Sequence, residues 1–290
     1  MTAALQDRVE NAPPLEFPPL EFDADHSSAY RRSLAVRDIM TAMQLWRLCI
    51  TLAWLDIRLR YRGSVLGPFW LTLSTALMIG SMGVIYATLF NMDVKEYMSF
   101  LALSLVLWGF MNTMVTEACT AYTSVESNIR SIRMPYSLYA ASNVVRNLVV
   151  LAHNLVVVVA VYLVLWTLPG WDALLALPGL LIWLVDGFAV GLLLGSLCAR
   201  FRDIPPIIGS LMQMAFFISA VIWKPSQLAA HEWMLAFNPL FALLEIVRAP
   251  LLGELPTRAV YLSALLISVL LCAVSWWVFV RVRGRIAFWV

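Results

Sequence analysis

The sequence predicts an all-α membrane protein. We expect six transmembrane helices, an N-terminal amphipathic interface helix, and a short re-entrant outer helical pair between spans 5 and 6. Hydrophobic residues make up 61% of the 290-residue chain and charged residues only 13%, about half the charged share of a soluble domain. Six apolar runs are each long enough to cross a bilayer, and arginines gather in alternate connections between them.

The N-terminal part divides into two segments. Residues 1–40 are rich in proline and acidic residues and are predicted to form a polar tail. Residues 41–64 are predicted to form a cytoplasmic amphipathic interface helix. Its leucines recur at spacings of three and four, which places them on one helix face: Leu45, Leu48, Leu52, Leu55 and Leu59.

Residues 65–285 are predicted to form the membrane domain. A spanning helix needs about 20 apolar residues. Six runs meet this requirement: 68–90, 97–116, 147–171, 173–199, 204–223 and 259–280. No cleavable signal peptide is recognised, so we expect the chain to insert through its own internal spans.

The basic residues predict the orientation. The outer connections hold four of them, Lys95, Lys224, Arg248 and Arg258, and the other 16 of the 20 fall on the opposite side. The positive-inside rule then puts both termini in the cytoplasm. Residues 224–257 lie outside in this topology. Their uncharged stretch from Trp233 to Leu244 is too short to cross, which favours a re-entrant helical pair whose second half starts at Asn238-Pro239.

Few residues carry recognisable chemistry. The three histidines and four cysteines show no metal-ligand spacing, and no paired acids indicate catalysis. The small net charge gives no reason to expect nucleic-acid binding. No Gly-x-x-x-x-Gly-Lys motif occurs, so an ATP-driven role would need a separate subunit. Asp186 lies deep in a span, where either a helix–helix hydrogen bond or a lumen-facing role fits. The ladder Gly187, Gly191 and Gly195 predicts close helix packing.

Four further motifs are informative. The first is Asp56-Ile-Arg-Leu-Arg-Tyr-Arg-Gly-Ser-Val-Leu-Gly-Pro-Phe-Trp70. The others are Arg130-Ser-Ile-Arg-Met-Pro-Tyr136, Phe201-Arg-Asp-Ile204 and Asn238-Pro-Leu240. Together these motifs resemble the permeases of ABC exporters for O-antigen, capsule and teichoic-acid polymers. The resemblance covers roughly residues 45–285.

The resemblance implies a non-enzymatic permease subunit, without a cofactor or metal of its own, in the bacterial inner membrane. It would form a homodimer and pair with two copies of an ATPase subunit that binds ATP and Mg. The substrate would be an undecaprenyl-linked polysaccharide, O-antigen above all, which would cross through a channel between the protomers.

The resemblance also suggests roles for individual residues. Arginines near the interface helix would bind the lipid pyrophosphate: Arg58, Arg60 and Arg62. Aromatic rings would line the channel: Tyr86, Phe90, Phe216, Phe217 and Trp223. The inner loop would couple to the ATPase through Glu126, Asn128, Ile129, Arg130 and Arg133. The outer pair would act as a gate at Asn238, Pro239 and Phe241.

Other functions remain open at this point. A capsule or teichoic-acid permease would carry the same motifs. A small-molecule or lipid ABC permease would share the six spans without the arginine-rich approach to the first. A secondary transporter needs several intramembrane carboxylates, and a membrane enzyme needs a cluster of acids or histidines at one face.

Overall fold

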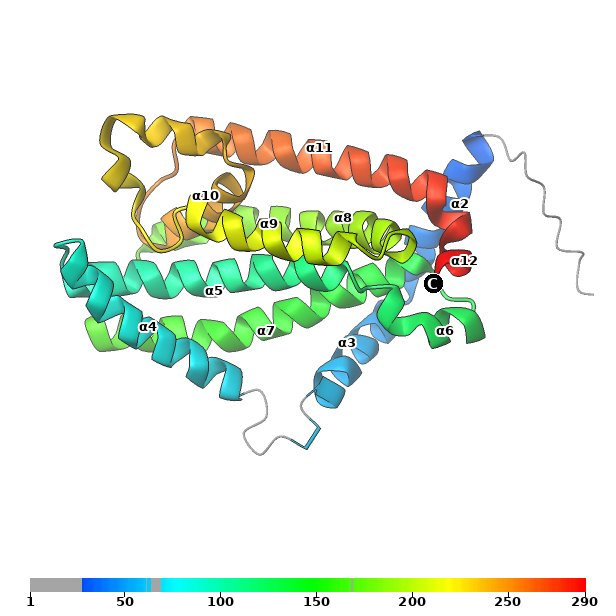
Figure 1. The fold of residues 1–290 in the computed structure, drawn as a ribbon, viewed down its shortest axis with the longest axis horizontal. Helices are drawn as coiled ribbons and strands as arrows, with labels where there is room; N and C mark the ends of the chain where they lie inside the picture. Colours follow the sequence, from blue (N-terminus) through cyan, green and yellow to red (C-terminus); the bar gives the residue numbers. More distant parts are fainter. Residues whose placement is uncertain (1–27, 61, 64–68, 168) are drawn as a thin grey trace, which may run out of the picture.

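The computed structural model describes residues 28–60, 62–63, 69–167 and 169–290, and helices account for most of them. No β-strand occurs within these ranges. The long helices lie side by side along one axis, whereas α2 and α3 run across it (Figure 1). The all-α membrane fold is therefore confirmed.

Within the described ranges, five helices are long and apolar enough to cross a membrane. They are α4 (Phe69–Leu89), α5 (Val94–Ala118), α7 (Tyr136–Leu165), α8 (Ala176–Arg200), which follows the short 3-10 segment η2 (Trp171–Leu175), and α11 (Arg258–Val282). α5 forms the centre of the bundle, because most of its residues are buried against its neighbours.

The predicted fifth span is shorter than expected. Helix α9 covers only Ile204–Ile218, which is about 22 Å at 1.5 Å per residue, less than the hydrocarbon core of a bilayer at about 30 Å. The chain turns at Ala220, whose φ is +49°. The following segment is held in place because Tyr97 Oη donates to the carbonyl of Ile222 at 2.6 Å.

The outer pair forms as predicted. The 3-10 segment η3 (Pro225–Phe237) is followed by α10 (Pro239–Leu251). His231–Phe237 and Pro239–Leu251 meet at 104°, so together they are a broken span or a re-entrant loop. The pair packs at the end of the bundle that carries the α4–α5 turn (Figure 1).

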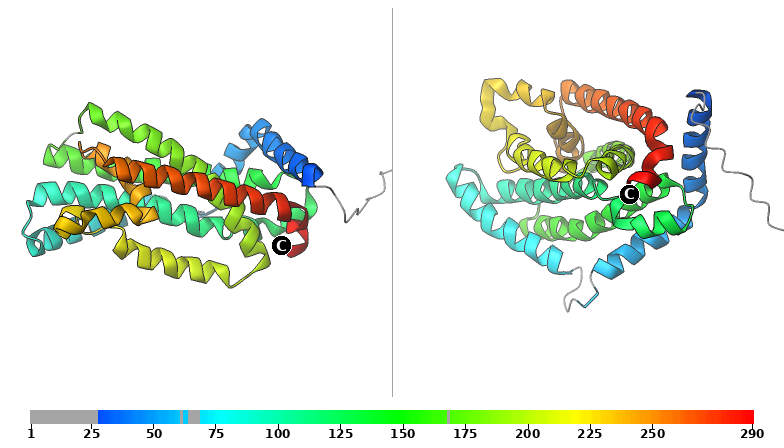
Figure 2. Two further views of the ribbon diagram at one scale, coloured as in Figure 1. Left: turned by 90° about the horizontal axis from the view of Figure 1, so that it is seen from above. Right: turned by 45° about the vertical axis from the view of Figure 1, so that its right-hand side comes forward.

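The opposite end of the bundle, here called the basic end, carries the short helices. These are α2 (Ser28–Gln44), η1 (Thr123–Val125), α6 (Glu126–Ser131), η4 (Arg283–Arg285) and α12 (Ile286–Trp289) (Figures 1 and 2). α2 begins within the segment 1–40 that composition assigns to a polar tail, and residues 1–27 lie outside the described ranges.

Helix α3 (Trp46–Arg60) occupies the place of the predicted interface helix. Its leucine stripe does not act as one face. Leu45, Leu48 and Leu52 pack against residues of α7, whereas Leu55 and Leu59 are exposed. The face of α3 that is buried along its length is formed instead by Cys49, Ala53 and Ile57.

The glycine ladder of α8 packs as predicted. A Cβ on Gly187 would lie 2.7 Å from Met114 Sδ, and one on Gly191 would lie 3.0 Å from Ala140 Cβ. Neighbouring helices therefore approach α8 more closely than a larger residue allows. Asp186 accepts a hydrogen bond from Ser268 Oγ of α11 at 2.7 Å, which favours the helix–helix role.

Candidate functional site

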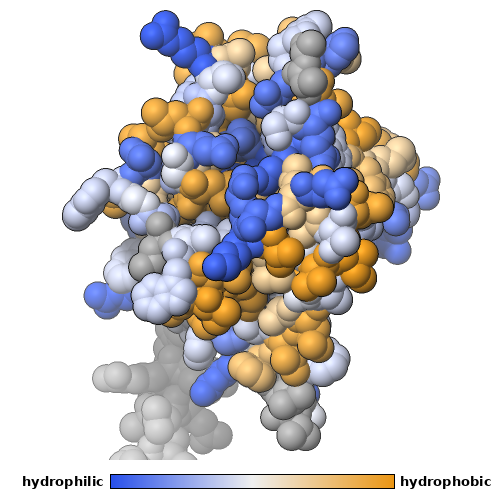
Figure 3. Space-filling view, turned by 90° about the vertical axis from the view of Figure 1, so that its left-hand side faces the viewer, coloured by the Kyte–Doolittle hydropathy of each residue, from blue (hydrophilic) through white to orange (hydrophobic). Residues whose placement is uncertain are grey.

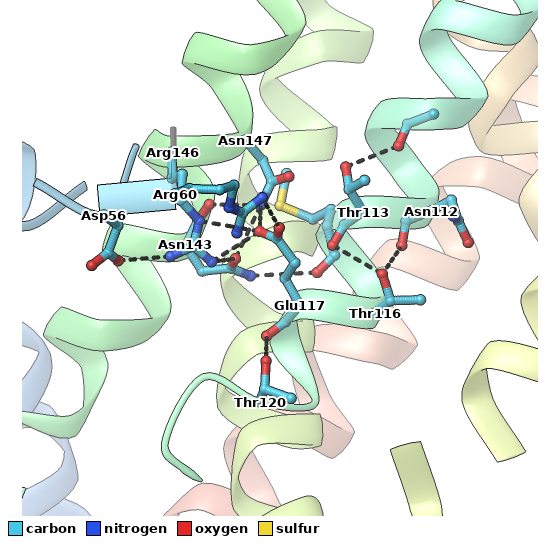
Figure 4. Close-up of polar contacts among 12 residues, drawn as sticks. Asp56, Arg60, Asn112, Thr113, Thr116, Glu117, Thr120, Asn143, Arg146 and Asn147 are labelled. Carbon is cyan, nitrogen blue, oxygen red and sulfur yellow. Dashed lines mark hydrogen bonds and ion pairs between the residues drawn. The ribbon is translucent and has the colours of Figure 1, made fainter. Parts of the chain in front are cut away.

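A cluster of charged and amide side chains joins α3, α5 and α7 (Figure 4). Arg146 of α7 donates from Nη1 to Asp56 Oδ2 at 2.8 Å, and from Nη2 and Nε to Glu117 Oε2 at 2.9 and 3.1 Å. Arg60 of α3 reaches the other oxygen of Glu117 at 2.7 Å. Asn147 Nδ2 donates to Glu117 Oε2 at 3.0 Å. Glu117 thus holds two guanidinium groups from two different helices.

The cluster balances its charges, with two arginines facing two carboxylates. Arg146 and Glu117 are only 14% and 19% exposed at the side chain, whereas Arg60 is 48% exposed. Asn143 and Asn147 lie one helical turn apart on α7 and accept or donate the remaining hydrogen bonds. Removing one partner of such a pair leaves an uncompensated charge in a poorly hydrated place. The cluster therefore fixes the angle at which α3 leaves the bundle.

The three arginines predicted to bind pyrophosphate are not equivalent. Arg60 is engaged with Glu117. Arg58 and Arg62 are exposed, and neither forms an ion pair within the described ranges. Residues 61 and 64–68, which complete the motif, lie outside those ranges. Among the described residues, Arg60 is therefore the one of the three that is held by a carboxylate.

The predicted coupling loop forms α6 at the basic end (Figure 1). Asn128, Arg130 and Arg133 are exposed, while Ile129 packs against the core at this end. Arg130 pairs with Glu126 at 2.6 Å and also donates to the main-chain oxygen of Val290 at 2.6 Å. A hollow of about 500 Å³ beside the helix is lined by Ile129, Arg130, Ile132, Arg133, Met134, Tyr136, Arg283, Gly284 and Ala287.

Asp38 joins three segments that are far apart in the sequence. Its carboxylate accepts from the amides of Tyr136 and Ser137 at 3.3 and 3.0 Å, and from Ser137 Oγ at 2.6 Å. Arg283 Nε donates to it at 2.8 Å. Asp38 therefore satisfies the free amides at the start of α7 and links α2 with η4. Sequence reasoning placed it in a polar tail.

At the opposite end, the predicted gate residues hold the bend of the outer pair. Asn238 Oδ1 caps α10 by accepting from the amides of Leu240 and Phe241 at 3.0 and 3.2 Å, and Pro239 takes the first helical position. Asn238 Nδ2 donates to Ser219 Oγ at 3.1 Å. Phe241 is buried against the core. The bend is thus connected to the turn that ends α9.

Arg248 was missed as a structural residue, because it was counted among the charges of an outer connection. It is fully buried. Its guanidinium pairs with Glu245, donates from Nη1 to Ser104 Oγ at 3.0 Å and to the carbonyl of Ala220 at 2.7 Å, and lies 4.6 Å from the ring of Phe100. The sequence offered one signal for this role: Arg248 follows Glu245 by one helical turn on an otherwise apolar helix. Arg248 ties α10 to α5 and to the α9 turn.

A cavity of about 360 Å³ opens at this end. Its acidic lining consists of Glu96, Glu232, Glu245 and Glu254, and Lys224 pairs with Glu96 beside it. Figure 3 shows hydrophilic residues crossing the middle of this end between apolar rims. The region enclosed by α5, η3 and α10 is therefore polar, in contrast to the sides of the bundle.

The predicted channel aromatics form two groups against α5. Tyr86 and Phe90 have ring centroids 5.7 Å apart, and Phe90 is 5.9 Å from Tyr97. Phe216 contacts Phe217 at 5.2 Å, and Trp223 Nε1 donates to the carbonyl of Phe217 at 2.9 Å. Phe217 is exposed, and the others are half-buried. The structure therefore places the five rings in two groups along the chain and not in one continuous row.

Comparison with known proteins places this arrangement in a family. Residues 47–252 match the ABC-2 type transporter model. The chain is 26% identical over 219 residues to the O-antigen export system permease protein RfbA of Myxococcus xanthus, covering 74% of this chain and 84% of that protein. It is 20% identical over 202 residues to a Klebsiella pneumoniae protein of the same name, covering 69% and 78%. The chain belongs to the ABC-2 type transporter family and is a multi-pass membrane permease.

Proposed function

We propose that the chain is the permease subunit of an ATP-driven exporter that moves a lipid-linked polysaccharide, of the O-antigen class, across the bacterial inner membrane. Two copies would form the channel, and two copies of a separate ATPase subunit, which binds ATP and Mg, would drive it. The relatives that carry the name of O-antigen export permeases support this substrate class. The basic end would face the cytoplasm, because arginines gather there.

The arrangement of α3 is the observation that carries the proposal. Arg60 and Asp56 anchor the helix to α5 and α7 through the polar cluster, while Arg58 and Arg62 stay exposed. A fixed helix with exposed guanidinium groups is suited to hold a pyrophosphate. The lipid tail would lie along the exposed Leu55 and Leu59.

Helix α6 would receive the movement of the ATPase. A push on α6 would reach α12 through the contact of Arg130 with Val290. The same push would also reach Tyr136, the first residue of α7, whose amide donates to Asp38 of α2. Both contacts lie at the basic end, so the movement would act on the helix ends that surround the channel opening.

The channel would form between the exposed faces of α4 and α9 of two protomers. One face of α9 carries Ile207, Leu211, Met214 and Ile218, all exposed and spaced by three or four residues. A helix too short to span the bilayer alone is suited to a protein interface. Phe217, also exposed on α9, would then lie near the path of the polysaccharide. A flat aromatic ring can contact the faces of many different sugars, so the polymer could pass without strict recognition of each sugar.

Deletion of the gene, followed by analysis of lipid-linked glycans, tests the function. We expect full-length lipid-linked polymer to accumulate inside the cell and to disappear from the surface. A truncated glycan would contradict export and indicate an enzyme. The composition of the accumulated polymer distinguishes O-antigen from capsule and teichoic acid. Co-purification of an ATPase subunit with the tagged chain is expected, and its absence from a functional preparation would contradict the ATP-driven mechanism.

A further inference from the structure

A second arginine-rich site lies at the basic end, between the first turn of α2 and the last turns of α11. It is a groove of about 460 Å³ lined by Ser28, Arg31, Arg32, Trp276, Trp277, Val280, Arg281 and Arg285. None of these side chains is acidic. The four arginines take part in none of the ion pairs formed among the described residues. Four guanidinium groups therefore line one groove, and no carboxylate of the described residues pairs with them.

The groove continues an apolar stripe of α11. Leu262, Leu266, Leu270 and Trp277 are exposed, and Arg281 follows one turn after Trp277. Their spacings of four, four, seven and four residues place them on one helix face. Arg281 lies over the ring of Trp277, with its guanidinium carbon 4.0 Å from the ring centroid. The same face therefore changes from apolar to aromatic to cationic as it reaches the basic end.

This order matches the cross-section of one bilayer leaflet. Acyl chains contact leucines, tryptophan favours the headgroup level, and arginine binds phosphate oxygens with paired N–H donors. α2 contributes the second pair of arginines from across the groove, and Figure 2 shows this end of α2 beside the last turns of α11. We propose that the groove binds the phosphate headgroup of an anionic phospholipid, whose acyl chains lie along the leucine face of α11.

The site is separate from the proposed pyrophosphate site on α3 and from the hollow beside α6, with which it shares no lining residue. The inference therefore does not depend on the exported substrate or on the ATPase. A bound lipid would join the start of α2 to α11 without any direct ion pair between them.

The test uses the full chain purified in a non-ionic detergent. Phosphatidylglycerol and phosphatidylcholine are titrated separately, and bound lipid is counted by native mass spectrometry. We expect saturable binding of phosphatidylglycerol to the unchanged chain. In Arg281→Gln/Arg285→Gln the affinity should fall about 10- to 30-fold, since each arginine near a phosphate contributes a few-fold. Arg281→Lys/Arg285→Lys should keep part of it.

The matched control is Arg37→Gln/Arg202→Gln, which removes the same charge from exposed positions outside the groove. An equal loss of affinity in the control would mean general surface charge and overturn the site. Equal binding of both lipids would also overturn it. Inorganic phosphate that competes at millimolar concentration, with no preference for the lipid, would indicate a free-anion site instead. Normal lipid binding with loss of a co-purifying ATPase would identify the groove as a protein-docking surface.

Discussion

Arg60 of the surface helix and Glu117 of the central helix form an ion pair of 2.7 Å across 57 positions of the chain. Arg146 binds the second oxygen of the same carboxylate. A substitution at Glu117 therefore disturbs two guanidinium groups at once, whereas a substitution at Arg60 leaves the Arg146 pair in place. This asymmetry allows the anchoring of α3 to be separated from contact with substrate.

Glu117→Gln should lower the free energy of unfolding by about 2–4 kcal/mol, because the mostly buried Arg146 keeps only Asp56 as a counterion and Arg60 loses its partner. Unfolding of the purified protein in mixed micelles measures this. Glu126→Gln is the control, since its partner Arg130 is mainly exposed and such pairs contribute about 0–1 kcal/mol. Equal losses of unfolding free energy in both variants would show that the cluster stabilises the protein no more than an exposed ion pair does.

Arg58→Gln/Arg62→Gln should reduce polymer export about tenfold while the amount of inserted protein stays unchanged, because both side chains are exposed and the lost contacts are those with phosphate. Surface polysaccharide and membrane protein levels are measured together. Arg58→Lys/Arg62→Lys should recover part of the export. Full export by the glutamine variant would assign these arginines to lipid anchoring alone.

Arg133→Glu should weaken co-purification of the ATPase subunit at least about tenfold, since a charge reversal on an exposed docking surface adds repulsion. Arg133 is exposed beside α6 and forms no ion pair among the described residues. Arg37→Glu, also exposed at the basic end, is the charge-matched control. If both variants retain the ATPase, α6 is not the docking helix.

Arg248→Ala should destabilise the outer pair by about 3–5 kcal/mol, because Glu245, which is only 14% exposed at the side chain, is left without its partner. The loss should appear as faster hydrogen exchange in α10 and in the segment after α9, which Arg248 joins. Lys224→Gln breaks a more exposed pair at the same end and should change exchange little. Unchanged exchange in Arg248→Ala would contradict the role of this residue as the link.

Asn238→Ala should cost about 1 kcal/mol through loss of the helix cap, whereas Ser219→Ala keeps the capping oxygen and removes only the hydrogen bond between Asn238 and Ser219. If the link between the bend and the α9 turn matters for gating, Ser219→Ala should alter export with little change in stability. Normal export in Ser219→Ala would restrict Asn238 to capping.

The bounds of some helices could be predicted because they depend on local properties, whereas α7 (Tyr136–Leu165) starts eleven residues before the predicted run 147–171. The runs 68–90 and 259–280 agree with α4 and α11 within about two residues, since hydropathy and length are read directly along the chain. Asn238-Pro239 marked the start of α10 because capping is also local chemistry. The packing of α8 followed from its glycines for the same reason.

The remaining features depend on partners that are distant in sequence. Arg58, Arg60 and Arg62 look alike along the chain, and only the position of Glu117 distinguishes Arg60. The early end of α9 depends on Arg248 and Tyr97, which hold Ala220 and Ile222. Arg248 itself is contacted by two other segments, α5 and the turn after α9, and no hydropathy window contains that information.

The carboxylate of Asp38 has a consequence for how the protein is made. Its partners Ser137 and Arg283 leave the ribosome about 100 and 245 residues later. The start of α7 can receive its cap early, but the junction at the basic end is complete only when the final span has been inserted. Until then the carboxylate of Asp38 lacks its last partner, Arg283, which has not yet been synthesised. We therefore expect the contact between Asp38 and Arg283 to form when the chain is released from the insertion machinery.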